Sequence, residues 1–179
     1  MKETKKIAIS AILCALSIVV LMLGSIITVL DLTMVGIASL MIVIAVIEIG
    51  GWYPYLVWLV TGTLSLLLLT DKFAALLYFL FGGIYPILKT YFEKLPFLFS
   101  WLCKLLCFNG MLTLFIFACN EIFMIPDTDL AFGWAVYGFC NLVFVLYDLA
   151  ATELIALYRK SFRKRLRLGR IFGSGEIKF

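Results

Sequence analysis

Long hydrophobic runs separated by short polar breaks dominate this chain of 179 residues. An α-helix needs about 20 apolar residues to cross the roughly 30 Å hydrocarbon core of a bilayer, so each such run predicts one membrane-spanning helix. Six runs are present, which predicts a six-helix bundle. Their expected bounds are Lys6 to about Leu30, Leu32 to Ile49, Tyr53 to Leu69, Phe73 to about Leu88, Leu102 to Met124 and Leu130 to Tyr158.

The amino-acid composition is that of an integral membrane protein. Hydrophobic residues make up 64% of the chain, charged residues make up 15%, and the mean hydropathy is +1.12. Soluble domains average roughly 45–50% apolar and about 25% charged residues, so a water-soluble fold is excluded. We predict an all-α integral membrane protein, with one transmembrane domain over residues 1–158 and a basic cytoplasmic tail over residues 159–179.

The first and fourth runs allow more than one interpretation. The first follows lysines, as a secretory signal peptide would, but it is longer than the usual core of about 7–15 residues, and we treat it as a retained helix. The fourth contains Gly82, Gly83 and Pro86, which weaken or kink a helix. We expect residues 89–96 to form a polar connection or an interfacial helix before the fifth span.

Lysine and arginine residues are divided unevenly between the two ends of the predicted helices. One side carries 14 of the 15, including Lys89, Lys94, Lys104 and those near both termini, whereas Lys72 lies on the other side. By the positive-inside rule, the side rich in cations is cytoplasmic. We therefore expect both termini in the cytoplasm and a multi-pass protein of a bacterial plasma membrane.

The basic tail has two possible roles. Clustered cations bind phosphate, which would suit a nucleic-acid partner. A basic stretch directly after a membrane span is more simply a topology anchor that rests on anionic lipid, at about 1 kcal/mol per residue near the surface. We expect the bilayer to be its partner and expect no nucleic acid.

Polar side chains at membrane depth are costly and usually face the bundle interior or a wet cavity, which makes them the main functional candidates. Helical spacing places them in two stripes, one on the fifth span and one on the sixth, and we expect the stripes to face each other. The members are Asn109, Thr113 and Asn120 on the fifth span, and Trp134, Tyr137, Asn141, Asp148 and Thr152 on the sixth.

Asp148 is the most costly of these residues. It lies about 10 residues, or roughly 15 Å, from the inner end of its span, where an unpaired charge costs several kcal/mol. The side chain must be protonated, hydrogen-bonded by Asn or Thr partners, or in contact with water or a ligand. Interhelical hydrogen bonding, a ligand or ion contact, and proton transfer all remain open as its role. Among the glutamates, Glu121 is the one expected to face an outer pocket.

Enzymatic and metal chemistry are disfavoured by what the chain lacks. It has no histidine, the commonest general base and metal ligand. Cys103 and Cys107 share a helical face, but two thiols fall short of a four-ligand zinc site. The P-loop sequence for ATP binding is also absent. We predict a non-enzyme without metal or cofactor; an intramembrane enzyme acting on lipid would need a second converging carboxylate or a metal.

A pair of small residues, Ala11 and Ala15, lies in the cytoplasmic half of the first span, where another helix can approach closely. This pair, the Lys-rich start, the six spans and the chain size resemble the substrate-binding S components of energy-coupling-factor (ECF) transporters. The resemblance covers the whole chain in topology. It implies a six-helix subunit that captures a vitamin or related micronutrient and works with a membrane coupling protein and two cytoplasmic ATPases.

The resemblance also assigns roles to residues. Ala11 and Ala15 would contact the coupling protein, and the ligand pocket would draw on the outer portions of the later helices above Asp148. Two features depart from the family. The first connection, around Asp31, is shorter than the segment that usually closes the pocket, and the amino-terminal histidine of metal-specific members is absent. The substrate-binding candidates are Asn120, Glu121, Trp134, Tyr137, Asn141 and Asp148.

A non-catalytic scaffold, such as a six-span morphogenesis subunit, is the alternative function. In that case the asparagines and Asp148 only hold the helices together. An interior without a cavity would favour this alternative.

Overall fold

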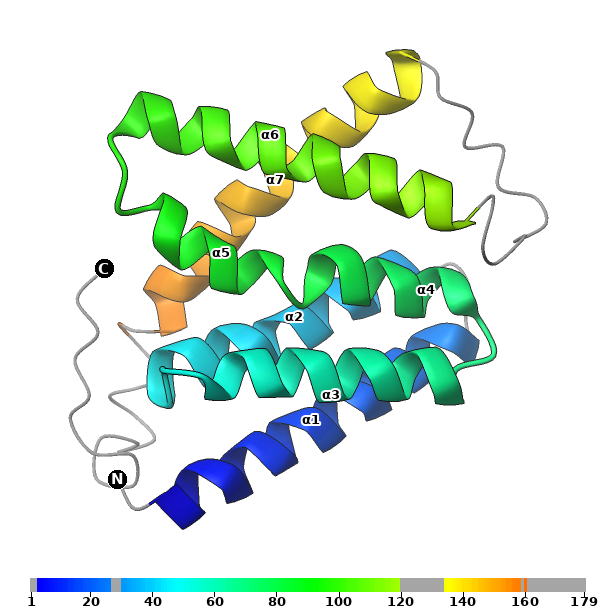
Figure 1. The fold of residues 1–179 in the computed structure, drawn as a ribbon, viewed down its shortest axis with the longest axis vertical. Coiled ribbons are helices and arrows are strands. Elements are labelled where there is room, and N and C mark those ends of the chain that lie inside the picture. Colours follow the sequence, from blue (N-terminus) through cyan, green and yellow to red (C-terminus); the bar gives the residue numbers. More distant parts are fainter. Residues whose placement is uncertain (1–2, 27–29, 120–133, 159, 161–179) are drawn as a thin grey trace.

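The described part of the chain is entirely helical and contains no strand. A computed structural model describes residues 3–26, 30–119, 134–158 and 160, and Figure 1 shows the arrangement of their helices. The elements are α1 (Glu3–Ile26), α2 (Asp31–Glu48), α3 (Tyr53–Leu68), α4 (Lys72–Leu77), the π-helical segment η2 (Tyr78–Gly82), α5 (Tyr85–Phe92), α6 (Phe97–Phe117) and α7 (Trp134–Leu157). The predicted all-α fold is confirmed over these residues.

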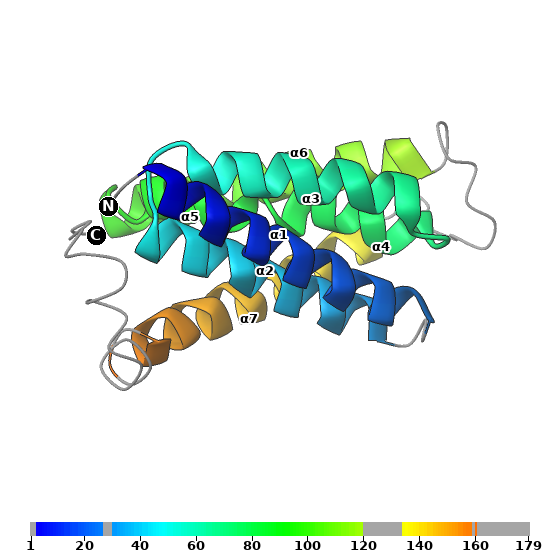
Figure 2. The ribbon, with the colours of Figure 1, turned by 90° about the horizontal axis from the view of Figure 1, so that it is seen from below.

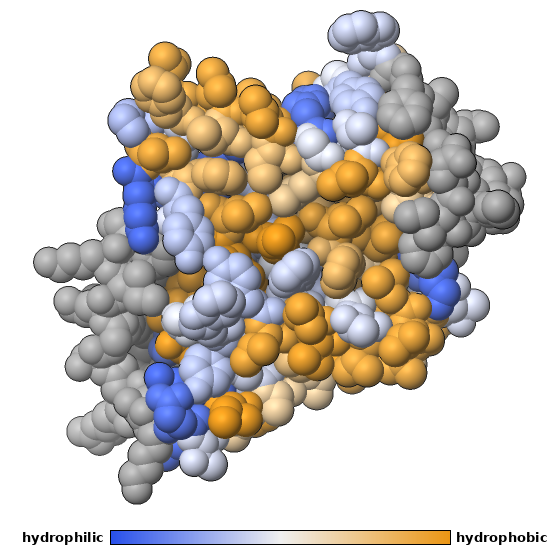
Figure 3. Space-filling view, in the orientation of Figure 1, coloured by the Kyte–Doolittle hydropathy of each residue, from blue (hydrophilic) through white to orange (hydrophobic). Residues whose placement is uncertain are grey.

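Within the described residues, five helical segments are long and apolar enough to cross a membrane. They are α1, α2, the stretch Lys72–Phe92, α6 and α7, whereas α3 is a shorter apolar helix of 16 residues. Large hydrophobic side chains such as Leu106 and Phe139 point outward, about 70% exposed (71% and 69%). Hydrophobic residues cover most of the face in Figure 3, and hydrophilic ones gather mainly toward the helix ends. This surface suits a lipid environment.

The first three helices form the best-packed part of the molecule. α1 packs against α2 and α3, and the buried side chains between them include Leu21, Ala38, Ile42 and Val57. The sharp turn from α2 to α3 uses Gly50 and Gly51, which both have φ of 64°. Glycine adopts this left-handed conformation without the steric cost of a Cβ atom.

The helix after α3 is broken, as the glycines and proline of the fourth run predicted. α4 passes into the π-helical segment η2, where the Gly83 amide donates to the Tyr78 carbonyl at 2.8 Å, and α5 then begins beside Pro86. A Cβ atom on Gly83 would lie 2.3 Å from the Trp58 ring. The indole of Trp58 uses this close approach to donate to the Phe79 carbonyl at 2.8 Å. The break redirects α5 relative to α4.

α7 packs mainly against α6 and is the least buried long helix of the structure. Phe144 stacks on Phe108 of α6 with ring centroids 4.3 Å apart, and its ring edge meets Tyr85 of α5. Figure 2 shows α7 diverging from α2 toward the end of the bundle at which α1 begins and α7 ends. We call that end the terminal end.

The polar connection predicted over residues 89–96 is wrong at its start, because Lys89 is buried in a helix, whereas Lys104 lies inside the fifth span as expected. Lys89 lies within α5 and Lys104 within α6, and their exposed fractions are 2% and 5%. Both helices extend further toward the terminal end than the hydrophobic runs suggest, because each lysine is neutralised inside the bundle. The connection between these helices is therefore short, from Glu93 to Pro96. The predicted bounds at Met124 and Leu130 lie outside the described residues.

Candidate functional site

An ion-pair cluster surrounds Asp148, which is only 2% exposed. One carboxylate oxygen accepts a hydrogen bond from Lys89 and another, at 2.5 Å, from the Tyr85 hydroxyl. The second oxygen accepts from Lys104 at 2.8 Å. The acid is therefore paired with two lysine side chains rather than bonded only by Asn or Thr residues.

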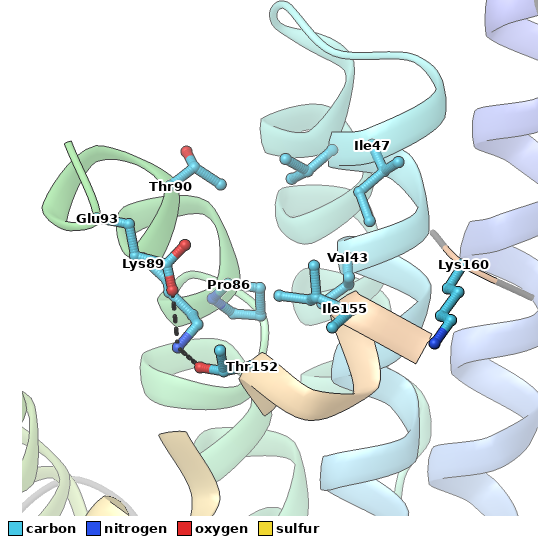
Figure 4. A pocket seen from close by; sticks show the side chains of 11 residues that line it. Val43, Ile47, Pro86, Lys89, Thr90, Glu93, Thr152, Ile155 and Lys160 are labelled. Atoms are coloured by element: carbon cyan, nitrogen blue, oxygen red, sulfur yellow. Dashed lines mark hydrogen bonds and ion pairs between the residues drawn. The ribbon is translucent and has the colours of Figure 1, made fainter. Parts of the chain in front are cut away.

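Lys89 is the most highly connected member of the cluster. Besides the carboxylate, its ammonium group donates to the backbone carbonyl of Asp148 at 3.2 Å and to the Thr152 hydroxyl at 2.8 Å. The carboxylate of Glu93, one turn further along α5, lies 3.1 Å away. Thr152 in turn donates to the Asp148 carbonyl at 2.8 Å. Figure 4 shows Lys89 between Glu93 and Thr152.

Helical spacing on three elements builds this cluster. Tyr85 and Lys89 stand four residues apart on α5, and Asp148 and Thr152 stand four apart on α7, so each pair shares a face. The break before α5 turns its pair toward α7. Lys104 reaches the same carboxylate from α6 and also lies 5.3 Å from the ring centre of Trp101.

The electrostatics of the cluster differ from those expected for a lone acid. Buried charges are tolerated when they are paired and hydrogen-bonded, which is the state of Asp148 here. Two cations face this carboxylate, and Glu93 supplies a second negative charge at the edge. A sequence signal for this pairing exists, because Lys104 is a lone cation inside an apolar helix, as Asp148 is a lone anion.

The two polar stripes meet as predicted. Asn109 and Asn141 exchange reciprocal side-chain hydrogen bonds of 3.0 and 2.9 Å, and the hydroxyls of Thr113 and Tyr137 lie 3.0 Å apart. These groups satisfy one another between α6 and α7. Their contacts leave few hydrogen-bonding groups aimed at a ligand.

The remaining predicted ligand residues are not gathered into a pocket by the described structure. Trp134 is 96% exposed at the start of α7, so it does not join the interior stripe. Asn120 and Glu121 lie outside the described residues. Neither Tyr137 nor Asn141 lines the two cavities described next.

Two adjoining cavities lie between α2, α5 and α7. The larger, of about 450 Å³, is near the terminal end and is lined by polar as well as apolar residues (Figure 4). The smaller, of about 270 Å³, is almost wholly apolar. We call the two together the α2–α7 cleft. The residues that line both cavities are Val43, Pro86, Lys89 and Ile155.

Sequence reasoning missed this cleft because it follows from the angle of α7. Lys89 lines the cleft on one side and holds Asp148 on the other. Thr152 also lines it, whereas Asp148 lies behind these two residues. The predicted acid therefore acts on the cleft through residues that it holds, namely Lys89, Thr152 and Tyr85 of the smaller cavity.

The Ala11 and Ala15 pair lies on the outer face of α1, and both residues are exposed. Next to them, Ile12 and Leu16 are also exposed, at 59% and 46%. This face is not used for packing within the described part of the bundle.

The cysteines give no indication of a metal centre. All five are free, and among the described residues no three Cys, Asp or Glu side chains gather closely enough to hold a metal ion.

No family of known proteins, no curated protein and no solved structure matches this chain.

Proposed function

We propose that this chain is a non-enzymatic, membrane-embedded subunit that binds a small solute and passes it inward while docked on a partner, as the S components of ECF transporters do. In this proposal six helices span a bacterial plasma membrane with both termini in the cytoplasm. The observation that carries the proposal is the α2–α7 cleft, a cavity with an organised polar wall between α2, α5 and α7.

The size and lining of the cleft support solute binding. Ligand sites commonly have volumes of about 300–1,000 Å³, with mostly apolar walls and a few placed polar groups. The larger cavity, of about 450 Å³, falls in this range. Its polar groups include Lys89, Thr152 and Glu93, and two of them are fixed by the Asp148 cluster. Such fixed groups can orient a ligand without first being ordered.

The position of the cleft indicates at which stage of inward transfer it would hold the solute. Its larger cavity lies in the half of the bundle nearest the terminal end, which the lysine and arginine distribution predicts to be cytoplasmic. The solute would therefore occupy the cleft as it leaves toward the cytoplasm. A change in the angle of α7 would open or close the site, since α7 is the least buried long helix.

The α1 face supports the partner half of the proposal. Ala11 and Ala15 are exposed and small, so a coupling-protein helix can approach their backbone closely. ATP hydrolysis would take place on the partner ATPases, because the chain has no P-loop sequence.

A scaffolding role is the second candidate, and one observation favours it. The polar groups between α6 and α7 satisfy one another, as in the Asn109–Asn141 pair, so they serve as helix-to-helix contacts. The cleft argues against this candidate, because a bundle that serves only as a scaffold gains no stability from an open cavity.

Purification from native membranes, followed by mass spectrometry, separates the two candidates. We expect co-purified ATPases and a small molecule retained by the subunit. Recovery of neither would contradict the transport proposal and favour the scaffold.

A further inference from the structure

The α2–α7 cleft has an apolar half that opens toward the bilayer. The smaller cavity is lined by residues such as Ile37, Leu40, Tyr147, Ala151 and Leu154, from facing sides of α2 and α7. Ile37 and Leu154 are 41% and 43% exposed, so the walls of this half reach the outer surface of the bundle. A hydrocarbon group can therefore enter from the side without crossing a polar barrier.

The other half of the cleft carries the charge. Its charged residues are Lys89, Glu93 and Lys160. Lys89 and Glu93 pair with each other, and Lys89 also serves Asp148. Lys160 has no ion-pair partner among the described residues and is exposed at the end of the cleft (Figure 4). This end therefore presents one surplus positive charge.

These two halves together select the class of ligand. A fully hydrophilic solute would leave the apolar half empty, and apolar cavities of this kind do not fill with water. A neutral hydrocarbon would make no use of the positive charge of Lys160, which attracts an anionic head group. A molecule with an apolar chain and an anionic head satisfies both halves.

We propose that the α2–α7 cleft binds an anionic membrane amphiphile, with its hydrocarbon chain between α2 and α7 and its head beside Lys160. This inference rests on the proposed function, because the amphiphile would be the solute that the subunit handles. It names a substrate class that enters from the bilayer rather than from water.

Two substitutions test the two halves of the cleft in the purified full-length protein. Ala150 is exposed and lines the apolar cavity, so A150F fills this half from the lipid side without overpacking the core. A135F is the matched control, an exposed alanine of α7 that lines neither cavity. K160Q removes the surplus charge, and K5Q is its matched control on α1.

The probe is lysophosphatidylglycerol, titrated into protein held in neutral detergent micelles, with neutral lysophosphatidylcholine and glycerol phosphate as comparisons. We expect A150F to weaken lysophosphatidylglycerol binding about tenfold or more. K160Q should weaken it about tenfold while leaving lysophosphatidylcholine unchanged. A135F and K5Q should bind as the parent protein does. If A150F fails to fold, the proposal is tested by K160Q alone, from its binding of lysophosphatidylglycerol compared with lysophosphatidylcholine.

Several results would overturn the inference. Equal affinity for the anionic and neutral amphiphiles would show that Lys160 does not recognise the head group. If glycerol phosphate bound as tightly as lysophosphatidylglycerol, the apolar half of the cleft would contribute nothing to binding. The proposed function fails separately. Co-purified ATPases with head-only binding would refute the amphiphile alone, whereas amphiphile binding without ATPases would refute the transport role alone.

Discussion

Asp148 shows how a membrane protein can keep a charge at depth. Lys89, Lys104 and Tyr85 together occupy both carboxylate oxygens, so the acid needs neither protonation nor water for its stability. The lysines in turn depend on the acid, because a cation buried in an apolar bundle is costly when it is alone. Removing the acid should therefore cost more than removing one lysine.

This asymmetry gives a prediction for D148N. The substitution leaves two buried cations without their shared carboxylate, and breaking a buried pair in this way typically costs about 3–5 kcal/mol. K104M should cost less than half as much, since Asp148 keeps Lys89 and Tyr85. Thermal unfolding of the purified variants measures both effects. The exposed carboxylate of Glu153 on the same helix supplies the control, E153Q.

The double variant D148N/K104M checks the cause of the loss. It should be more stable than D148N alone, because D148N keeps Lys89 beside Glu93 but leaves Lys104 without its carboxylate, and the second substitution removes that buried cation. A D148N protein as stable as the parent would show that the cluster does not hold α7 in place.

Some of the polar contacts between the last helices could be predicted from the sequence, and others could not. The meeting of Asn109 with Asn141 follows from helical spacing and the antiparallel order of the last two spans. The lysine partners of Asp148 do not follow from it, because Lys89 stands in the expected polar connection and Lys104 stands near the inner end of the fifth span, where a cation can also reach water. A hydropathy pattern does not record whether a cation near a boundary faces water or a buried acid.

Among the helices, α7 depends on side-chain contacts more than on close helix packing. Its attachments include the Asp148 cluster, the Asn109–Asn141 pair, the ring of Phe144 against Phe108, and a hydrogen bond of 2.8 Å between the hydroxyls of Tyr147 and Ser39. The rest of its surface is largely exposed. The angle of α7 and the cleft beside it are therefore set by a few residues, which explains why sequence periodicity did not reveal them.

α1 supplies the prediction for partner docking. Replacing Ala11 and Ala15 by Leu adds bulk to an exposed face, so the fold should persist while a coupling protein loses its close approach. Co-purification should fall about tenfold or more. A135L, an exposed Ala-to-Leu change on α7, is the matched control. Unchanged co-purification of the A11L/A15L variant would exclude this face as the interface.

At the scale of the whole molecule, the charge distribution predicts the orientation. Lys89 and Lys104 are buried and ion-paired, so they no longer count as loop charges, and 12 cations remain on the terminal side against Lys72. The asymmetry survives, and both ends of the chain should be cytoplasmic.

Reporter fusions measure this orientation directly. Green fluorescent protein fused after Phe179 should fluoresce, and alkaline phosphatase fused after Lys72 should be active outside the membrane. A fluorescent fusion at Lys72 together with a dark fusion at Phe179 would show that the bundle has the opposite orientation. The terminal end of the cleft would then face the outside of the cell.

The all-helical fold was predictable, because an apolar run of about 20 residues has few other stable forms in a membrane. The break at Gly82, Gly83 and Pro86 was also predictable, because glycine and proline disfavour a continuous helix. The angles between helices were not predictable from the sequence, because they depend on which side chains fill the space between the helices. The cleft belongs to this second group.

A structure of the protein determined experimentally in native-lipid discs tests the central claim most directly. If the cleft is a ligand site, non-protein density should lie between α2 and α7, in contact with Val43, Pro86 and Ile155. A structure in which α7 closes on α2 and leaves no space between them would contradict it.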